Sequence, residues 1–217
     1  MAKKTKDIDA YGMQHWNGHI MCAIDTETTG TDDQWHELIQ ICIMPLNYDL
    51  KPIKTIAPFY VELMPDYPER VDPEAIGVNK VTMAKIAIRG IDREQAKDVL
   101  EEWIGRLGLP YTRGGIRKRL IPLGHNYAFD RGFIMRWLGN QYEDFFDGLY
   151  RDTMQASLYA NDRAAFHGEK VPYSKNNLSW LAKEHNLKFH SRAHDAMQDC
   201  IVTAETYRQM VMTGLMG

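Results

Sequence analysis

The chain has 217 residues, of which 44% are hydrophobic and 25% are charged, and its formal net charge is −3. This size and composition are typical of one folded domain with a sizeable core, and no apolar run is long enough to span a membrane. The basic residues at the start are not followed by an apolar stretch, so a secretory signal is not expected. We expect an N-terminal arm over residues 1–19 and a single domain over residues 20–217.

The three cysteines, Cys22, Cys42 and Cys200, lack the Cys-x-x-Cys spacing of a redox or zinc motif. Two of them fall in predicted strands and the third falls in a predicted helix. We therefore expect reduced thiols in the core of a protein of the cytoplasm, or of the host cytoplasm if the source is viral.

The first predicted strand carries a pair of acids. An apolar run, Ile20 to Ile24, lies between two glycines and leads into Asp25 and Glu27. Side chains alternate along a strand, so both carboxylates point to the same face. Adjacent acids repel each other, and Mg²⁺ or Mn²⁺ is the natural counter-charge. The alternative is a strand end that simply enters solvent.

Two more strands are expected close behind, at residues 38–44 and 56–64. Pro58 makes the second of these an edge strand, because proline cannot donate to a ladder. Three consecutive strands joined by short turns predict an antiparallel meander.

Helices follow the meander. Short helices are expected over residues 73–89, and Asp92 with Gln95 forms a capping box for an amphipathic helix. A fourth strand is expected over residues 120–124, after the basic loop at residues 112–119. A strand after a helix after a meander gives a mixed α/β architecture.

The fourth strand leads directly into Gly-His-Asn-Tyr-Ala-Phe-Asp, residues 124–130. Asn126 is a good N-cap, which puts Asp130 in the first turn of the next helix, where the dipole favours an anion. Ligands of α/β sheets commonly bind where strands end, so Asp130 is also positioned to join a site there.

The remaining chain is predicted as a loop over residues 141–150, a fifth strand at 149–153, a helix to about residue 161, and a mobile polar insertion over 161–174. A short helix opens at Asn177.

The final helix begins with a second capping box, formed by Asp195 and Gln198. His194 then lies just outside the helix and Asp199 lies in its first turn, so both side chains can reach one point.

These three clusters, read together, resemble the exonuclease motifs of the DnaQ-like DEDDh family: DTETTG, GHNYAFD and AHDAMQD. The resemblance covers roughly residues 20–212. It implies a ribonuclease H-like fold, in which a mixed central sheet, built from an antiparallel meander of three strands plus parallel strands, is flanked by helices. It also implies a 3′–5′ exonuclease that acts on single-stranded DNA and releases nucleoside 5′-monophosphates.

The resemblance assigns roles to individual residues. Two Mg²⁺ or Mn²⁺ ions, which can clamp a phosphodiester, would be held by four carboxylates: Asp25, Glu27, Asp130 and Asp199. Binding of cations there would leave the protein nearly neutral, so a polyanionic partner is compatible with the net charge. His194 would act as the general base for water. The terminal nucleotide is expected to contact five residues: Thr28, Thr29, Gly30, Asn126 and Tyr127.

Several alternatives stay open at this point. The enzyme could be an exoribonuclease of the ribonuclease T or oligoribonuclease kind, because no residue of the sequence decides between DNA and RNA. A non-catalytic nucleic-acid-binding or polymerase-associated module is a different class of protein, although the presence of all five catalytic residue types counts against it. A DNA polymerase or another replication or repair partner, and a homodimer, also remain open. Arginines and lysine of the 112–119 loop could follow a phosphate backbone or form a solvated loop.

Overall fold

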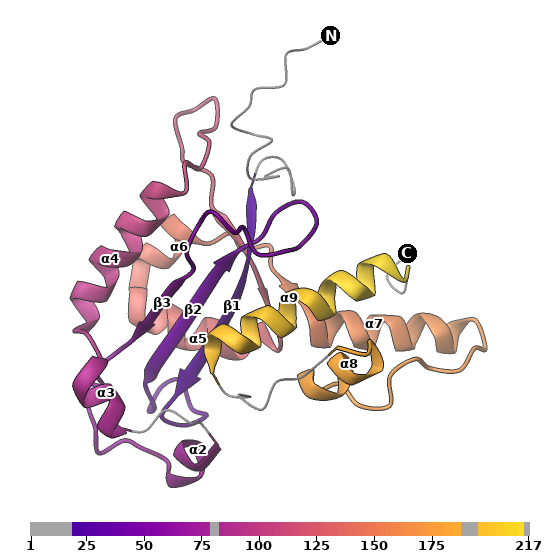
Figure 1. Cartoon of the computed structure of the whole chain (residues 1–217), viewed down its shortest axis with the longest axis horizontal. Helices are drawn as coiled ribbons and strands as arrows, with labels where there is room; N and C mark the ends of the chain where they lie inside the picture. The colour runs from indigo at the N-terminus through magenta and orange to yellow at the C-terminus, as the bar shows by residue number, and fades with distance from the viewer. Residues whose placement is uncertain (1–18, 79–82, 188–194, 215–217) are drawn as a thin grey trace.

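The structure, a computed structural model, describes residues 19–78, 83–187 and 195–214. At its centre lies a five-stranded sheet with the strand order β3-β2-β1-β4-β5. Helices cover both faces of this sheet (Figure 1). Most of the predicted N-terminal arm and the predicted general base, His194, lie outside the described residues.

The sheet is mixed, as the sequence predicts. β1 (Ile20–Thr28), β2 (Leu38–Pro45) and β3 (Phe59–Glu62) form the antiparallel meander. β4 (Leu120–Gly124) and β5 (Arg151–Asp152) continue the sheet in parallel with β1. β3 is an edge strand as expected but is shorter than predicted, because Pro58 has no N–H and the ladder begins only after it.

Most of the helices form two layers, one on each face of the sheet. One layer consists of α4 (Arg93–Arg106), α5 (Tyr127–Leu138), the 3₁₀ turn η1 (Gly139–Gln141) and α6 (Tyr142–Phe145). The other layer consists of α7 (Thr153–Phe166), α8 (Leu178–Glu184) and α9 (Ala196–Met212). The short helices α2 (Pro73–Val78) and α3 (Met83–Arg89) follow the edge strand β3.

Each face of β1 belongs to a different hydrophobic core. Ile20, Cys22 and Ile24 pack with α4, α5 and α6, whereas Met21 and Ala23 pack with α7, α8 and α9. Side chains alternate along a strand, so the odd-numbered residues of β1 face α9 and the even-numbered residues face α5. This alternation decides which helix can approach each polar residue at the end of the strand.

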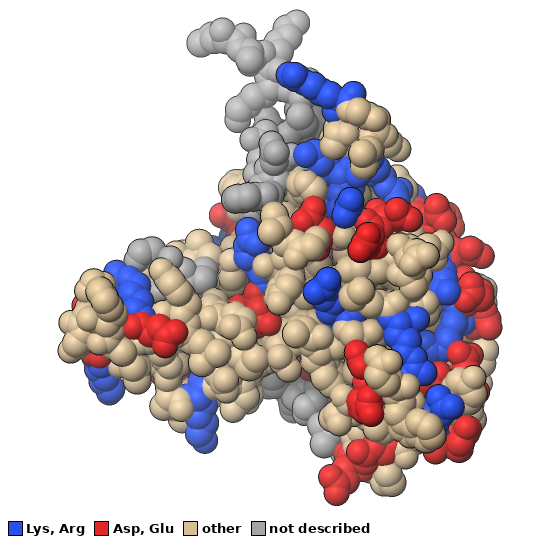
Figure 2. Space-filling model, turned by 180° about the vertical axis from the view of Figure 1, so that it is seen from behind, with Lys and Arg blue, Asp and Glu red and all other residues tan. Residues whose placement is uncertain are grey.

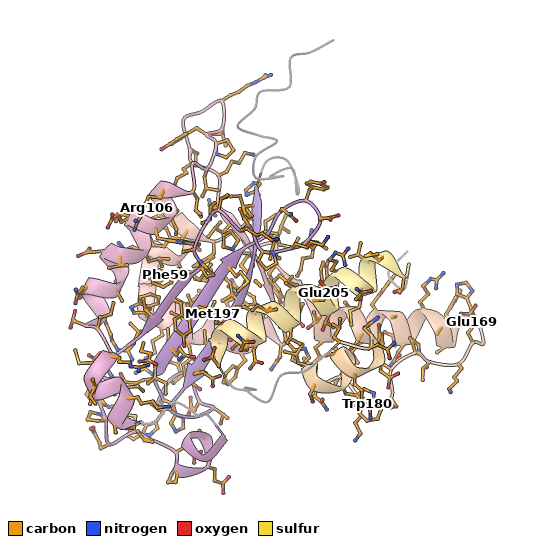
Figure 3. The ribbon with its side chains drawn as sticks, viewed as in Figure 1. Phe59, Arg106, Glu169, Trp180, Met197 and Glu205 are labelled. Atoms are coloured by element: carbon orange, nitrogen blue, oxygen red, sulfur yellow. The ribbon has the colours of Figure 1, made fainter. Side chains whose placement is uncertain are left out.

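The edge of the sheet is closed by aromatic packing. Phe59 of β3 points toward α4 (Figure 3), where its ring lies 5.9 Å from the ring of Trp103. The indole N–H of Trp103 donates to the carbonyl of Ala57, 2.8 Å away. These contacts hold the short strand β3 against the helix layer.

Two segments differ from the sequence-based expectation. Within residues 141–150, expected as loop, residue 141 ends η1 and residues 142–145 form α6, and both elements are too short to show a helical period. Helix α7 continues to Phe166 instead of ending near Asn161. The side chain of Asn161 holds the backbone of Tyr173 through two hydrogen bonds of 2.7 and 3.0 Å. The polar segment therefore starts later than predicted and folds back onto its own helix.

The basic loop lies at the far end of the sheet from the acids of β1. It begins with a bridge between Tyr111 and Arg117, and the carbonyl of Arg119 lies 2.8 Å from the ring of His19, just before β1. Figure 2 shows Lys and Arg side chains gathered at this end of the molecule. Glu27 stands seven positions after Ile20 on the strand, so roughly 23 Å lie between the loop and the acids.

The three cysteines are free and buried. In the described ranges there is no helix that combines the length and the apolarity needed to cross a bilayer.

Candidate active site

Three carboxylates converge at the carboxyl end of β1. Asp25 and Glu27 project from the face of β1 that α9 covers, and Asp199 comes from the first turn of α9. One oxygen from each of the three lies within 4.8 Å of the other two. This spacing suits a shared divalent cation, because Mg²⁺ and Mn²⁺ prefer carboxylate oxygen.

The start of α9 is fixed by two capping interactions. The carboxylate of Asp195 accepts hydrogen bonds from the N–H groups of Met197 and Gln198, so Asp195 is the N-cap of α9, as predicted. The side-chain oxygen of Gln40, on β2, accepts a 3.0 Å hydrogen bond from the N–H of Ala196. The Gln40 amide also donates to the hydroxyl of Tyr60 on β3, 2.9 Å away. Strand β2 therefore sets where the helix begins and, with it, where Asp199 lies.

Asp130 approaches β1 from the opposite face. It lies in the first turn of α5, as predicted, and only 4% of it is exposed. The hydroxyl of Thr26 donates to Oδ1 of Asp130 over 2.6 Å. Thr26 faces α5 because it stands between Asp25 and Glu27 on the strand. The end of β1 thus reaches acids of both helix layers.

Burial, together with repulsion between neighbouring acids, raises the pKa values of Asp25, Glu27 and Asp130. The pKa of Asp25 is raised well above its usual value, first by burial and then by the charges of Asp130, Glu27 and Asp199. Burial, followed by the charges of Asp199, Asp130 and Asp195, raises the pKa of Glu27 to about 8. Burial raises the pKa of Asp130 to about 7, although the hydrogen bond from Thr26 opposes the shift. Divalent cations would supply the missing positive charge, so these residues fit a metal centre.

The cluster opens into a pocket of about 390 Å³. Its wall includes the backbone stretch after β1, the start of α2, and residues from α5 and α9: Asp25, Thr26, Glu27, Thr28, Gly30, Thr31, Asp72, Glu74, Ala75, Phe129 and Asp199. The N–H of Asp72 donates to the carbonyl of Thr29 over 2.7 Å and joins the two sides of this wall.

Of the residues expected to contact the terminal nucleotide, Thr28 and Gly30 line the pocket. Thr29 is fully buried, and its hydroxyl accepts a 2.8 Å hydrogen bond from the N–H of Glu37. Position 30 needs glycine for a local structural reason, because the ring of His36 occupies the space that a Cβ would need. The turn is therefore shaped by its own packing before any ligand binds.

Tyr127 and Asn126 are not among the residues that line this pocket. Tyr127 is fully buried, and its hydroxyl lies 3.0 Å from that of Tyr142. Phe129 is partly buried against the core and also lines the pocket, so it supplies an aromatic side chain there. Asn126 is exposed, adopts a left-handed backbone with φ of 60°, and within the described residues its side chain caps no N–H of α5.

The cap of α5 comes instead from Asp152, at the end of the neighbouring strand β5. Its carboxylate accepts hydrogen bonds from the N–H groups of Asn126 and Tyr127, at 3.1 and 2.8 Å, and also from two N–H groups of its own helix α7. An acid between a predicted strand and a predicted helix is the sequence signal for the cap of α7. That the same acid also caps α5 is seen only in the structure.

His125 supports this region from beside the pocket. Its Nδ1 lies 2.8 Å from the hydroxyl of Thr153, and burial lowers the pKa of its imidazole. The catalytic assignments of the five predicted residues, and of His194 in particular, stay predictions.

Comparisons with known proteins define the class of this fold and site. The family model described as "Exonuclease", of the RNase T type, matches residues 22–207. Ribonuclease T of Vibrio vulnificus (strain YJ016) is 31% identical over 200 residues, which are 89% of this chain and 85% of the relative. Ribonuclease T of Vibrio campbellii is 30% identical over 89% of this chain and 86% of the relative. The chain belongs to the RNase T exonuclease family, within the DnaQ-like 3′–5′ exonucleases.

Solved structures share the fold at lower identity. A zinc-bound complex of E. coli exonuclease I with single-stranded DNA superposes with a TM-score of 0.65 at 20% identity, covering 91% of this chain and 42% of that one. Cell-death related nuclease 4 gives a TM-score of 0.65 at 18% identity and covers 90% of this chain and 64% of its own. The chain thus spans less than half of exonuclease I. The predicted ribonuclease H-like fold is confirmed.

Proposed function

We propose that this protein is a metal-dependent 3′–5′ exonuclease that hydrolyses single-stranded DNA from its 3′ end. The observation that carries the proposal is the convergence of Asp25, Glu27 and Asp199 within 4.8 Å, at the mouth of a pocket. Membership of the exonuclease family supports the same reaction class.

The four acids would hold two Mg²⁺ or Mn²⁺ ions. Asp25, Glu27 and Asp199 form the group on the α9 side of β1, and Asp130 adds a carboxylate from the α5 side, oriented by Thr26. When bound, such ions activate water and stabilise the charge on the leaving oxygen. The charges of the other three acids all raise the pKa of Asp25, so Asp25 would help to hold the ions from the middle of the set.

The reaction needs one proton acceptor. Water attacks the terminal phosphorus, the bond to the 3′ oxygen of the preceding nucleotide breaks, and a nucleoside 5′-monophosphate leaves a strand with a new 3′ hydroxyl. We assign the proton of the attacking water to His194, whose ordinary pKa of about 6.5 suits a base at neutral pH. The assignment rests on its position directly before Asp195, the cap of α9.

An exoribonuclease is the second candidate. The names of the curated relatives, at 27–31% identity, favour it, since all four are ribonuclease T. DNA is preferred as the first candidate because structural neighbours include exonuclease I bound to single-stranded DNA, dA16 and dT13. A non-catalytic module would have no need of four converging acids, three of which have raised pKa values.

The test is a parallel digestion of 5′-labelled DNA and RNA oligomers of one sequence, with Mg²⁺ and with EDTA. We expect DNA to shorten from its 3′ end in Mg²⁺ and to stay intact in EDTA. Faster shortening of RNA would select the second candidate. Early release of the labelled 5′ nucleotide, or hydrolysis in EDTA, would contradict the proposal. Copurification with a DNA polymerase would separate a proofreading role from a stand-alone one.

A further inference from the structure

Two exposed aromatic rings and a guanidinium form a cluster beside the pocket. Trp35 is 54% exposed and Tyr67 is 44% exposed, although burial of such large rings is favourable. The guanidinium carbon of Arg70 lies 4.4 Å from the centre of the Trp35 ring and 3.8 Å from that of Tyr67. Residues from two separate loops thus join into one aromatic and cationic surface, which we call the 35/67/70 platform.

The platform is joined to the pocket wall through the backbone of both loops. Arg70 stands two residues before Asp72, which lines the pocket, so their Cα atoms are within roughly 7.6 Å. The hydrogen bond from Asp72 N–H to the Thr29 carbonyl fastens this segment to the turn after β1. Trp35 follows the same turn and precedes His36, whose ring packs on Gly30.

Both loops are held before any ligand arrives. The buried carboxylate of Glu37 accepts hydrogen bonds from the N–H groups of Asp66 and Tyr67, at 3.2 and 2.8 Å. Arg136 of α5 donates to the carbonyls of Asp33 and His36, on either side of Trp35, at 2.7 and 3.0 Å. Loops whose backbones are held in this way lose little conformational freedom when a ligand binds, which favours affinity.

We propose that the 35/67/70 platform is a base-stacking subsite for the single-stranded nucleic acid that enters the pocket. This inference rests on the proposed function and adds a substrate contact to it. Every base has a π-face, so aromatic rings bind strands with little sequence preference. Arg70 places a positive charge near a pocket whose described lining contains five carboxylates and no lysine or arginine.

The first experiment separates KM from kcat for removal of the first nucleotide from a 12-residue oligothymidylate, or its RNA counterpart if RNA is the substrate. Trp35→Ala should raise KM about 5- to 150-fold, the change expected for one lost stack, with kcat within twofold of wild type. Trp35→Phe should recover most of the affinity. Tyr48→Ala, which removes a 69% exposed ring from the turn after β2, is the matched control and should leave KM unchanged.

The second experiment uses oligomers with a single abasic site placed at successive positions from the 3′ end. Wild type should bind the oligomer more weakly when the abasic site lies at one particular position. Trp35→Ala should bind that abasic oligomer and the intact oligomer equally well. Such non-additivity identifies a base–ring contact, which a general effect on folding would not produce.

The outcomes distinguish the platform from the proposed function. If wild type degrades oligomers and Trp35→Ala matches it in KM at every position, the platform is refuted and the exonuclease assignment stands. A surface that serves a protein partner or a second copy of this chain would give that same result. If wild type degrades neither DNA nor RNA, the proposed function fails and this subsite fails with it.

Discussion

The hydroxyl of Thr26 donates a 2.6 Å hydrogen bond to Asp130, although the two residues are 104 positions apart in the chain. Thr26 stands between Asp25 and Glu27 on β1 and faces the opposite helix layer. One strand end therefore presents two carboxylates to α9 and orients a third on α5. The metal centre that we propose depends on this two-sided arrangement.

Replacing Thr26 should weaken metal binding without unfolding the protein. Thr26→Val keeps the shape but removes the only donor we invoke for orienting Asp130. Loss of such a supporting hydrogen bond typically costs 10–100-fold in metal affinity, and we expect that range for Mn²⁺ in calorimetric titration. Thr55→Val, at an exposed site, is the control. Equal Mn²⁺ affinity in Thr26→Val and wild type would remove Thr26 from this role.

Removing a carboxylate should abolish hydrolysis while preserving the fold. Asp25→Ala and Asp199→Ala each delete a proposed metal ligand and also relieve repulsion in the metal-free cluster. Nuclease activity should fall to background, and the melting temperature in EDTA should be unchanged or higher. Asp98→Ala, on the exposed face of α4, should behave as wild type in both measurements. Wild-type rates in either ligand variant would refute the assignment.

The metal-free protein should become less stable as the pH rises. The pKa of Glu27 is about 8 in the folded state against an ordinary value of 4.5, so the folded state binds a proton that the unfolded state has lost between these values. Unfolding free energy in EDTA should therefore decline from about pH 5 to pH 8. Saturating Mn²⁺ should remove the decline at the upper end.

Glu27→Gln is the control for that pH dependence, because it keeps the shape and cannot ionise. Its stability in EDTA should fall less steeply over the same range than that of wild type. A wild-type melting temperature that rises with pH in EDTA would contradict the raised pKa.

Gln40 should act on the site from a distance. Gln40→Leu leaves the N–H of Ala196 and the hydroxyl of Tyr60 without their buried partner, which costs about 1–3 kcal/mol. Because Gln40 sets the start of α9, Mn²⁺ affinity should fall together with stability. Gln155→Ala, at an exposed position on α7, is the control. A loss of stability with unchanged Mn²⁺ affinity would limit Gln40 to a structural role.

His194→Ala should lower kcat by about 10²–10⁴-fold, the usual scale for loss of a general base, and should flatten the acidic limb of the pH–rate profile. His167→Ala, an exposed histidine after α7, should leave the profile intact. An acidic limb that survives in His194→Ala would assign the proton to another group.

The sequence predicts the features that depend on short-range rules. Alternation along a strand puts Asp25 and Glu27 on one face, and Asp-x-x-Gln spacing locates the starts of α4 and α9. The meander follows from the turn lengths and the edge position of β3 follows from Pro58, whereas the parallel strands are implied by the resemblance to the DnaQ-like family.

Features that depend on distant contacts could not be predicted in this way. Asp152 caps α5 across a strand, and Tyr127 turns into the core to meet Tyr142, so neither position follows from its neighbours in sequence. Gln40 shows no local signal, because its partners lie 20 and 156 positions away.

Anomalous diffraction from crystals soaked in Mn²⁺ addresses the proposed metal centre directly. We predict manganese density bounded by the side chains of Asp25, Glu27 and Asp199, with a second peak toward Asp130. Crystals that stay free of anomalous density at these acids under saturating Mn²⁺, or that show them turned away from one another, would contradict the account.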